Sequence, residues 1–375
     1  MSDSEKTTVA EVDLECLRSN YRAIRRHVAP ADVMAVVKAN AYGHGAVPVA
    51  RCLQVEGARH FAVARLAEGL ELQQAGITGK ILIFGTLFPD ELETAIAHGL
   101  QVTATRVEDF AMAARLAAAQ RGTASVHVKV DTGMGRVGLP CDSAVEAIRS
   151  ASALPGLRIE GVYTHFATAD CREKSFAQEQ LARFTSLIGG LQRAGVSVPL
   201  VHAANSGAIL DLPAACFDLV RPGIALYGHY PTSETSESVP LRQVMTFKTR
   251  VAQVRALPAG TSVSYGRRYV TQNATRIAVL NVGYADGVSR AFTNKGQVLI
   301  RGQLFPMVGT VTMDQIMVDV GTAPVGVGDE VVLWGQSNQG ALAATQVAER
   351  VGTIPYELCC AVAPRVPRRY LNEGN

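Results

Sequence analysis

The feature that most constrains the fold is an alternation of short apolar runs with longer helical patterns over the first two thirds of the chain. Residues 33–38 read VMAVVK, and seven further β-rich runs follow at 61–64, 81–85, 102–106, 126–131, 159–166, 200–205 and 217–221. Helical patterns separate most of these runs, such as the long stretch from Ser175 to Gly195. Strands that alternate with helices form a parallel sheet through right-handed crossovers. Eight such units in about 200 residues predict an α/β fold of the (β/α)8 TIM-barrel type, although the seventh crossover, SGAILDLPAA, is short.

The pattern changes after residues 229–240, HYPTSETSESVP, a polar stretch with proline and serine that is typical of a linker. From residue 241 onward the sequence reads as strands and turns, and helical periodicity appears only near residues 341–350. We therefore expect two domains, a barrel over residues 1–240 and a mostly β C-terminal domain over residues 241–375.

The composition excludes several classes of protein. Of the 375 residues, 48% are hydrophobic and only 18% are charged, against roughly 25% charged in average soluble domains, so a disordered chain is excluded. The net charge of +3 comes without a long basic block, and we expect no nucleic-acid partner. No apolar run approaches the roughly 18 residues that cross a bilayer. The polar start, MSDSEKTTVAEVDLE, is unlike a signal peptide, so we expect a cytoplasmic protein without a membrane partner.

Metal and disulfide chemistry lack support in the sequence. The seven cysteines include no C-x-x-C pair, and the only close pair, Cys359 and Cys360, is adjacent. This usage indicates reduced thiols rather than a disulfide framework or a structural zinc site. The chain also lacks an H-E-x-x-H motif, and we expect no catalytic metal.

GMGRVG at residues 133–138 matches the G-x-G-x-x-G pattern of dinucleotide-binding loops. Such a loop opens directly into a helix and is followed by an acidic residue at the end of the next strand. Here LPCDS follows the glycines, the helical pattern begins only near Ser143, and Glu160 stands near the start of its strand. We interpret the motif as a glycine-rich loop at a strand end and not as a nicotinamide-binding site.

Polar residues stand at several strand ends. Functional residues of this barrel type lie at the C-terminal ends of the strands, where the chain has Lys38, Arg136, His165, Asn205, Ser206 and Arg221. Phosphate groups are usually held by the loops after the seventh and eighth strands, which contain Ser206, Gly207, Gly223 and Ile224. A lysine beside a phosphate site indicates a phosphorylated carbonyl cofactor held by that lysine, for which pyridoxal phosphate is the candidate.

Nine motifs, in order and over residues 8–370, resemble those of the pyridoxal-phosphate-dependent alanine racemases. They are VVKANAYGHG (36–45), DTGMGRVG (131–138), THFATAD (164–170), NSGA (205–208), RPGIALYG (221–228), SYGRRY (264–269), GYADG (283–287), TMDQ (312–315) and RVPRRY (365–370). The resemblance implies an isomerase that interconverts L-alanine and D-alanine with pyridoxal 5'-phosphate. It also implies that D-alanine is supplied for peptidoglycan synthesis.

The resemblance assigns two catalytic bases, one on each face of the substrate. Lys38 would hold the cofactor and handle the proton on the D face, and the apolar run before it would lower the pKa of its amine. Tyr265 would handle the proton on the L face, and a nearby cation must help it ionise because phenol has a pKa near 10. Tyr265 would come from the partner subunit, which implies a homodimer with shared active sites.

Other residues receive binding roles from the same resemblance. Arg221 would face the pyridine nitrogen and keep it unprotonated, since arginine has no proton acceptor; a direct contact with phosphate is the alternative. His165 would support Arg221, and Arg136 would bind the substrate carboxylate. Substrate contacts from the second domain would come from Met313, through its backbone N–H, and Asp314. The phosphate would be held by the hydroxyls of Tyr42, Ser206 and Tyr356 and the N–H groups of Gly223 and Ile224.

Two positions extend or depart from the family pattern. Lys129 precedes Asp131 by two residues on one strand, so both side chains point to the same face, and in several relatives the corresponding lysine is carbamylated. Carbamylation of Lys129 is therefore a hypothesis for this chain. Thr312 stands where many relatives have cysteine, which would change the pocket wall or the sensitivity to inhibitors.

Three alternatives remain open at the level of sequence. A racemase of broader specificity, for serine, lysine or arginine, would share the same residues. An amino-acid decarboxylase of the same barrel type is disfavoured by Arg221 and by the SYG and GYADG motifs. A cofactor-carrying single-barrel protein is disfavoured by the second domain of about 130 residues.

Overall fold

The computed structural model describes residues 7–338 and 340–373. Eight parallel strands from the first two thirds of the chain pair in the order β10-β2-β3-β4-β5-β6-β8-β9. Backbone hydrogen bonds join the two ends of this order, from Asp218 N to Val201 O at 3.1 Å and from Arg221 N to Ala204 O at 2.9 Å. The sheet is therefore a nearly closed barrel, and the prediction of a (β/α)8 fold is confirmed. Its strands are β2 (Asp32–Val36), β3 (His60–Val63), β4 (Lys80–Ile83), β5 (Gln101–Ala104), β6 (Ala124–Asp131), β8 (Leu157–Tyr163), β9 (Leu200–His202) and β10 (Leu219–Val220).

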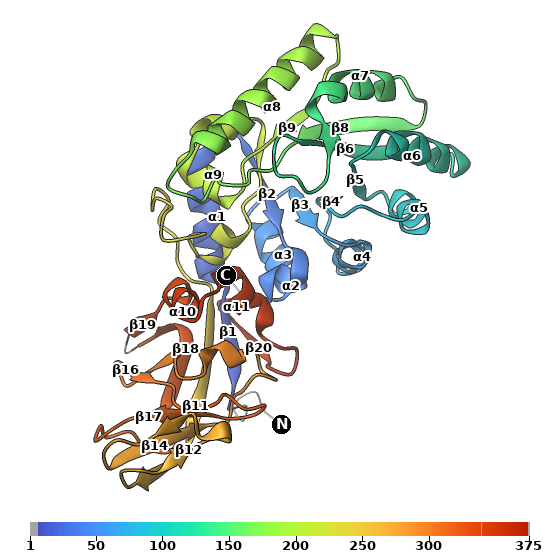
Figure 1. Cartoon of the computed structure of the whole chain (residues 1–375). Helices are drawn as coiled ribbons and strands as arrows, with labels where there is room; N and C mark the ends of the chain where they lie inside the picture. Colours follow the sequence, from blue (N-terminus) through green and yellow to red (C-terminus); the bar gives the residue numbers. More distant parts are fainter. Residues whose placement is uncertain (1–6, 339, 374–375) are drawn as a thin grey trace.

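Helices surround the barrel strands (Figure 1). They are α1 (Leu14–Val28), α3 (Ala46–Val55), α4 (Leu66–Gln74), α5 (Pro89–Ala97), α6 (Val107–Ala119), α7 (Cys141–Ser152), α8 (Ser175–Arg193) and α9 (Ser206–Asp211). The seventh crossover is short, as its sequence predicts, and consists of α9 and the 3-10 turn η2 (Pro213–Ala215). A second 3-10 turn, η3 (Ile224–Tyr227), follows the last barrel strand.

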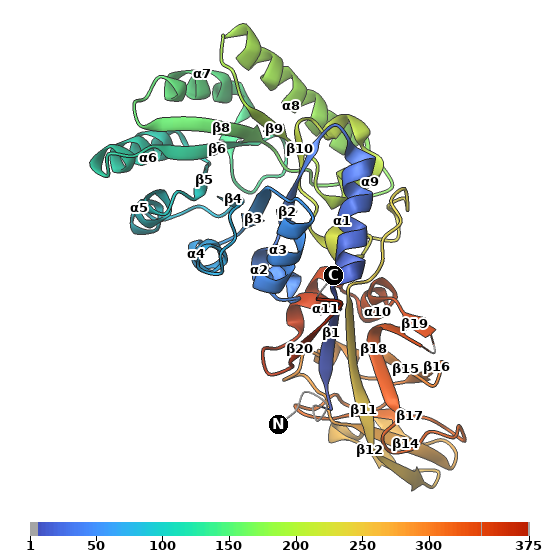
Figure 2. The same cartoon turned by 180° about the vertical axis from the view of Figure 1, so that it is seen from behind.

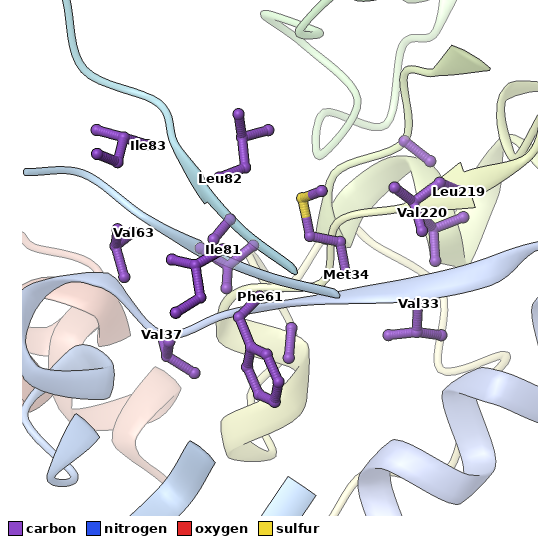
Figure 3. Packing of buried hydrophobic residues seen from close by; sticks show 14 of the residues in the cluster. Val33, Met34, Val37, Phe61, Val63, Ile81, Leu82, Ile83, Leu219 and Val220 are labelled. Atoms are coloured by element: carbon purple, nitrogen blue, oxygen red, sulfur yellow. The ribbon is translucent and has the colours of Figure 1, made fainter. Parts of the chain in front are cut away.

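The barrel strands are apolar on both faces, as expected of a parallel sheet covered by helices. Figure 3 shows side chains from β2, β3, β4 and β10 packed in this core. Val33 and Met34 are fully buried, and so are Phe61 and Leu82 on the neighbouring strands. This packing fixes the strand ends, and with them the residues at the mouth of the barrel.

The second domain is built mainly from strands, as predicted. Its strands are β11 (Met245–Leu257), β12 (Ser262–Val263), β13 (Tyr269–Val270), β14 (Thr275–Leu280), β15 (Gln297–Ile300), β16 (Gln303–Pro306), β17 (Ile316–Asp319), β18 (Glu330–Ser337), β19 (Gly340–Leu342) and β20 (Arg368–Leu371). Trp334 is fully buried in this domain and packs edge-on against Phe247, with ring centroids 4.7 Å apart. No helix within residues 7–338 and 340–373 is long and apolar enough to cross a membrane.

The first strand of the chain belongs to the second sheet. β1 (Val9–Asp13) pairs antiparallel with β11 and parallel with β20. Figure 2 shows β1 leading from this sheet into α1 beside the barrel, with β11 alongside. Residues 9–13 thus lie in the sheet of the second domain, although they precede the barrel in the sequence.

Two local expectations change in detail. The helix near residues 341–350 is present as α10 (Ala344–Val351), and a further helix, α11 (Pro355–Ala361), was not predicted because seven residues are too few to show periodicity. After the loop at residues 133–138, the short strand β7 (Leu139–Pro140) intervenes before α7, which begins at Cys141 rather than near Ser143. The glycine loop does not open directly into a helix, so it lacks the context of a dinucleotide-binding loop.

Candidate active site

Lys38 follows β2 at the C-terminal end of the barrel and begins a left-handed turn. The helical segment α2 (Lys38–Tyr42) has left-handed backbone angles at Ala39, Asn40 and Ala41, each with φ of 53°, and Tyr42 has φ of 52°. Left-handed residues other than glycine cost roughly 1–2 kcal/mol each, so the surrounding structure must hold this turn. Burial, with Arg136 as a further cause, lowers the pKa of Lys38 below its usual range.

Arg221 is held by a set of acceptors inside the mouth. Its Nη1 donates to His202 Nδ1 at 3.0 Å, and its Nη2 donates to the carbonyl oxygens of Thr164 at 2.7 Å and Ala203 at 2.9 Å. His165 Nδ1 lies farther away, 3.4 Å from Nη2. Burial lowers the pKa of Arg221 to about 10, and the guanidinium lies 5.2 Å from the centroid of the Tyr163 ring.

The histidines beside Arg221 are neutral acceptors. Burial and the Arg221 charge hold the pKa values of His165 and His202 well below the usual range. Because arginine only donates, His202 Nδ1 accepts, and its Nε2 lies 2.9 Å from His127 Nδ1 in the barrel interior. The run Arg221–His202–His127 is thus directional: Arg221 donates to His202, and the neutral His202 donates through Nε2 to His127 Nδ1.

A small polar cradle lies beside the turn and the last two barrel strands. Ser206 Oγ accepts hydrogen bonds from Gly223 N at 3.0 Å and from Ala225 N at 3.3 Å. A Cβ on Gly223 would lie 2.4 Å from the Tyr42 hydroxyl oxygen, so only glycine fits this approach. The Tyr356 ring from α11 lies 6.0 Å from that of Tyr42, and neither hydroxyl has a hydrogen-bond partner among the described residues.

The mouth gathers several cations. Lys129 is buried, and its pKa is lowered to about 8 by burial and by the charges of Arg136 and Arg221. Arg136 is exposed on the loop after β6. Asp131 holds this loop, because its Oδ1 accepts from the N–H groups of Gly133 at 2.9 Å, Met134 at 2.8 Å and Gly135 at 3.2 Å.

A second group of residues lines a cavity of about 960 Å³ on the C-terminal domain. Tyr265 is 75% exposed there, and Met313 is 52% exposed. Asp314 accepts a hydrogen bond from Arg365 Nη2 at 2.8 Å. The Met313 carbonyl accepts from Ala285 N at 3.1 Å, whereas its N–H donates no hydrogen bond within the described part of the chain. Thr312 lies on the same wall.

Within one chain the predicted site residues therefore form two groups. The first lies at the barrel mouth, and it contains Lys38, Tyr42, Lys129, Arg136, His165, Ser206, Arg221, Gly223, Ile224 and Tyr356. The second contains Tyr265, Met313 and Asp314, and every residue that lines its cavity is Thr8 or lies between Tyr265 and Arg365. β12, which ends two residues before Tyr265, lies at the end of the second domain that is remote from the barrel (Figures 1 and 2).

Sequence reasoning missed three residues that shape the mouth. His202 lies inside the seventh predicted strand, and its alternation with Ala204 was the available signal that it faces the barrel interior. Asp131 was noted only as a neighbour of Lys129, although an aspartate before glycines commonly binds loop N–H groups. Glu68 contacts the turn after Lys38 through a hydrogen bond from Ala39 N at 2.6 Å, and no local pattern indicates such a long-range contact.

Comparisons with known proteins agree with this architecture. The family model for the N-terminal domain of alanine racemase matches residues 12–231, and that for the C-terminal domain matches residues 244–370. An alanine racemase of Desulforamulus reducens is 46% identical over 96% of this chain and 98% of its own. The solved alanine racemase of Streptomyces coelicolor is 37% identical, with a TM-score of 0.93 over 99% of both chains. That of Bartonella henselae, solved with covalently bound pyridoxal phosphate, is 31% identical, with a TM-score of 0.89 over 98% of this chain and 100% of the other.

Proposed function

Since the chain belongs to the alanine racemase family and is an isomerase, we propose that it interconverts L-alanine and D-alanine with pyridoxal phosphate, using Lys38 and Tyr265 as two bases. The observation that carries this proposal is the convergence, at one barrel mouth, of Lys38, the cradle around Ser206 and the buried Arg221. Cytoplasmic location and supply of D-alanine for peptidoglycan are part of the same proposal.

The residues present fit pyridoxal phosphate. The Tyr42 and Tyr356 hydroxyls lack protein partners among the described residues and would donate to the phosphate, together with Ser206. The Gly223 N–H donates to Ser206 Oγ, whereas the Ile224 N–H makes no hydrogen bond in the described part of the chain. When bound, the cofactor supplies an electron sink that stabilises negative charge at the substrate Cα.

Lys38 is suited to hold the cofactor and then to move a proton. Burial lowers the pKa of its amine, so a larger fraction of Nζ is neutral near pH 7 than in a solvent-exposed lysine. A neutral amine can attack a carbonyl and can accept a proton at Nζ. We assign to Lys38 the proton on the D face of the substrate.

Tyr265 would act on the opposite face from the partner subunit. Its 75% exposure leaves the hydroxyl free to enter the barrel mouth of a second copy. The cations of that mouth would favour loss of its proton, as a phenol in this role requires. The same docking would bring the Met313 N–H and Asp314 to the substrate, so each active site of the homodimer would contain both residue groups.

Arg136 and Arg221 would divide two tasks. The exposed Arg136 can bind the substrate carboxylate with two parallel hydrogen bonds. Arg221 would face the pyridine nitrogen, where a group without a proton acceptor keeps that nitrogen unprotonated. This arrangement weakens the electron sink and disfavours transamination as a side reaction.

A carbamylated Lys129 would orient Arg136. Its pKa of about 8 provides neutral amine to react with carbon dioxide, and the product is an anion beside two cations. NMR of the protein equilibrated with isotopically labelled bicarbonate would detect a carbamate. Its absence, with Lys129 a plain amine, would exclude this part of the proposal.

Chiral chromatography tests the proposed reaction. L-alanine, L-serine, L-lysine and L-arginine are each incubated with the protein and pyridoxal phosphate, beside the Lys38→Ala variant as control. We expect alanine to approach an equal mixture of enantiomers, the others to react slowly, and the variant to lose both activity and the visible band of bound cofactor. Faster conversion of another amino acid would indicate a racemase of broader specificity.

A further inference from the structure

The left-handed turn after Lys38 carries residues at both of its ends that face the cofactor site. Lys38 begins the turn, and Tyr42, whose hydroxyl lies against Gly223, completes it. Within the turn, Gly43 N donates to Ala39 O at 3.0 Å. Residues in such strained conformations persist only where neighbouring groups hold them, so the contacts that hold this turn determine where Lys38 points.

Glu68, on α4, contacts the end of the turn next to Lys38. Its Oε1 accepts the Ala39 N–H at 2.6 Å. Its Oε2 accepts the N–H groups of Ala64 at 2.7 Å and Arg65 at 3.0 Å, which caps α4. A single carboxylate thus joins the start of the turn to the loop after β3. Hydrogen bonds to ionised acceptors are stronger than neutral ones.

The other end of the turn has its own support. His44 Nδ1 lies 2.9 Å from the carbonyl oxygens of both Ala41 and Tyr42, so it donates to them. The His44 ring stacks on Tyr227 with centroids 4.5 Å apart, and Tyr227 in turn packs against Tyr42. The phosphate end is therefore held by His44, which leaves Glu68 as the side-chain contact nearest to Lys38 on the turn's backbone.

We propose that Glu68 is a positioning residue for Lys38, whose carboxylate fixes the first amide of the left-handed turn so that Nζ is aimed at the cofactor aldehyde. The inference rests on the proposed function, in which Lys38 binds the cofactor covalently. Glu68 touches neither cofactor nor substrate in this role and acts only through the backbone at Ala39.

The same chain offers a matched control at Asp109. Asp109 Oδ2 caps α6 by accepting the N–H groups of Thr105 at 2.8 Å and Arg106 at 3.0 Å, just as Glu68 Oε2 caps α4. Asp109 has no contact with the turn among the described residues. Asp109 also pairs with the exposed Arg106, whose Nη2 lies 2.8 Å from Oδ1, so Asp109→Asn reports the loss of a charged cap and of this ion pair. Glu68→Gln removes the charge from both the cap and the contact with the turn, and leaves one acceptor oxygen where the two contacts use two.

The experiment separates attachment from binding in the cofactor-free protein. The rate at which Lys38 attaches pyridoxal phosphate is followed by absorbance. The affinity for pyridoxine phosphate, which has an alcohol in place of the aldehyde and cannot react with lysine, is measured by calorimetry. For Glu68→Gln we expect attachment to slow about tenfold or more, with the affinity for pyridoxine phosphate unchanged and Asp109→Asn like the unmodified protein in both measurements.

Glu68→Asp tests the geometry if the glutamine variant does not fold. It keeps a carboxylate for the cap of α4 but is one methylene too short to reach Ala39 as well, and we expect the same slow attachment. Attachment at the normal rate in either variant overturns the proposal, and so does a parallel loss of pyridoxine phosphate binding, which indicates a general structural role. Failure of the unmodified protein to attach pyridoxal phosphate would instead contradict the proposed function itself.

Discussion

Arg221 Nη1 donates a hydrogen bond to His202 Nδ1 over 3.0 Å, and both side chains are buried inside the barrel mouth. This contact fixes the tautomer of His202, because a guanidinium offers only donors. The neutral imidazole in turn fixes the plane of the guanidinium. The group proposed to face the cofactor ring is thus held from behind by the barrel interior.

Removal of this acceptor leaves a buried donor without a partner. We expect His202→Leu to lower the free energy of unfolding by about 1–3 kcal/mol, measured by urea denaturation. His98→Leu is the control, because His98 is exposed at the end of α5. Equal stability of the two variants would show that the contact between Arg221 and His202 contributes nothing to the fold.

The buried histidines also predict how stability depends on pH. Burial lowers the pKa of His44 to about 4 and those of His127 and His229 to about 3. In the unfolded chain these histidines take up protons near pH 6.5, whereas in the folded chain their imidazoles stay neutral. Stability is therefore retained above pH 6.5 and falls as the pH decreases toward 4, by up to about 1.4 kcal/mol per pH unit for each histidine.

Urea denaturation at several pH values between 7 and 5 checks this slope. We expect His229→Phe to remove the contribution of one histidine to the pH dependence of the free energy of unfolding. Stability should then fall less steeply with decreasing pH than in the unmodified protein. A stability that is constant over this range would contradict neutral histidines in the folded state. A variant with an unchanged slope would exclude His229 as one of the groups responsible.

The barrel and its mouth were predictable from sequence because periodicity and strand-end positions are local signals. The strand that ends before Lys38 is apolar over five residues, and the alternation of eight such runs specifies the layer arrangement. β1 was not assigned to the second sheet, because it pairs with β11, for example Val9 with Lys248, and the sequence of the whole barrel lies between these two residues. The contact between Glu68 and Ala39 was missed for the same reason, since tertiary packing alone brings them together.

The proposed phosphate cradle depends on the absence of a side chain at residue 223. In Gly223→Ala the new Cβ would lie 2.4 Å from the Tyr42 hydroxyl oxygen and 3.1 Å from Cζ, so the ring must move. We expect the dissociation constant of pyridoxal phosphate to rise about tenfold or more, as a loss of about 1.4 kcal/mol produces. Gly326→Ala, in open space on the second domain, is the control. Unchanged cofactor affinity in Gly223→Ala would place the phosphate elsewhere.

The separation of Lys38 and Tyr265 into two residue groups predicts complementation between subunits. Lys38→Ala and Tyr265→Phe should each be inactive, because every site of the proposed homodimer then lacks one of the two proposed bases. In the proposed arrangement each site takes Lys38 from one subunit and Tyr265 from the other, so a hybrid dimer would contain one site with both substitutions and one site with neither. Mixing the two variants under conditions of subunit exchange should therefore restore part of the racemase activity.

The expected recovery follows from the proportions of the mixture. Random exchange of equal amounts gives about half hybrid dimers, each with one intact site of two, so activity should approach about one quarter of that of the unmodified protein. Exchange is verified by mass spectrometry of differently tagged subunits, and each variant re-mixed with itself is the control. Zero activity in a mixture with demonstrated hybrids would show that Lys38 and Tyr265 act within one chain or that Tyr265 is not the second base.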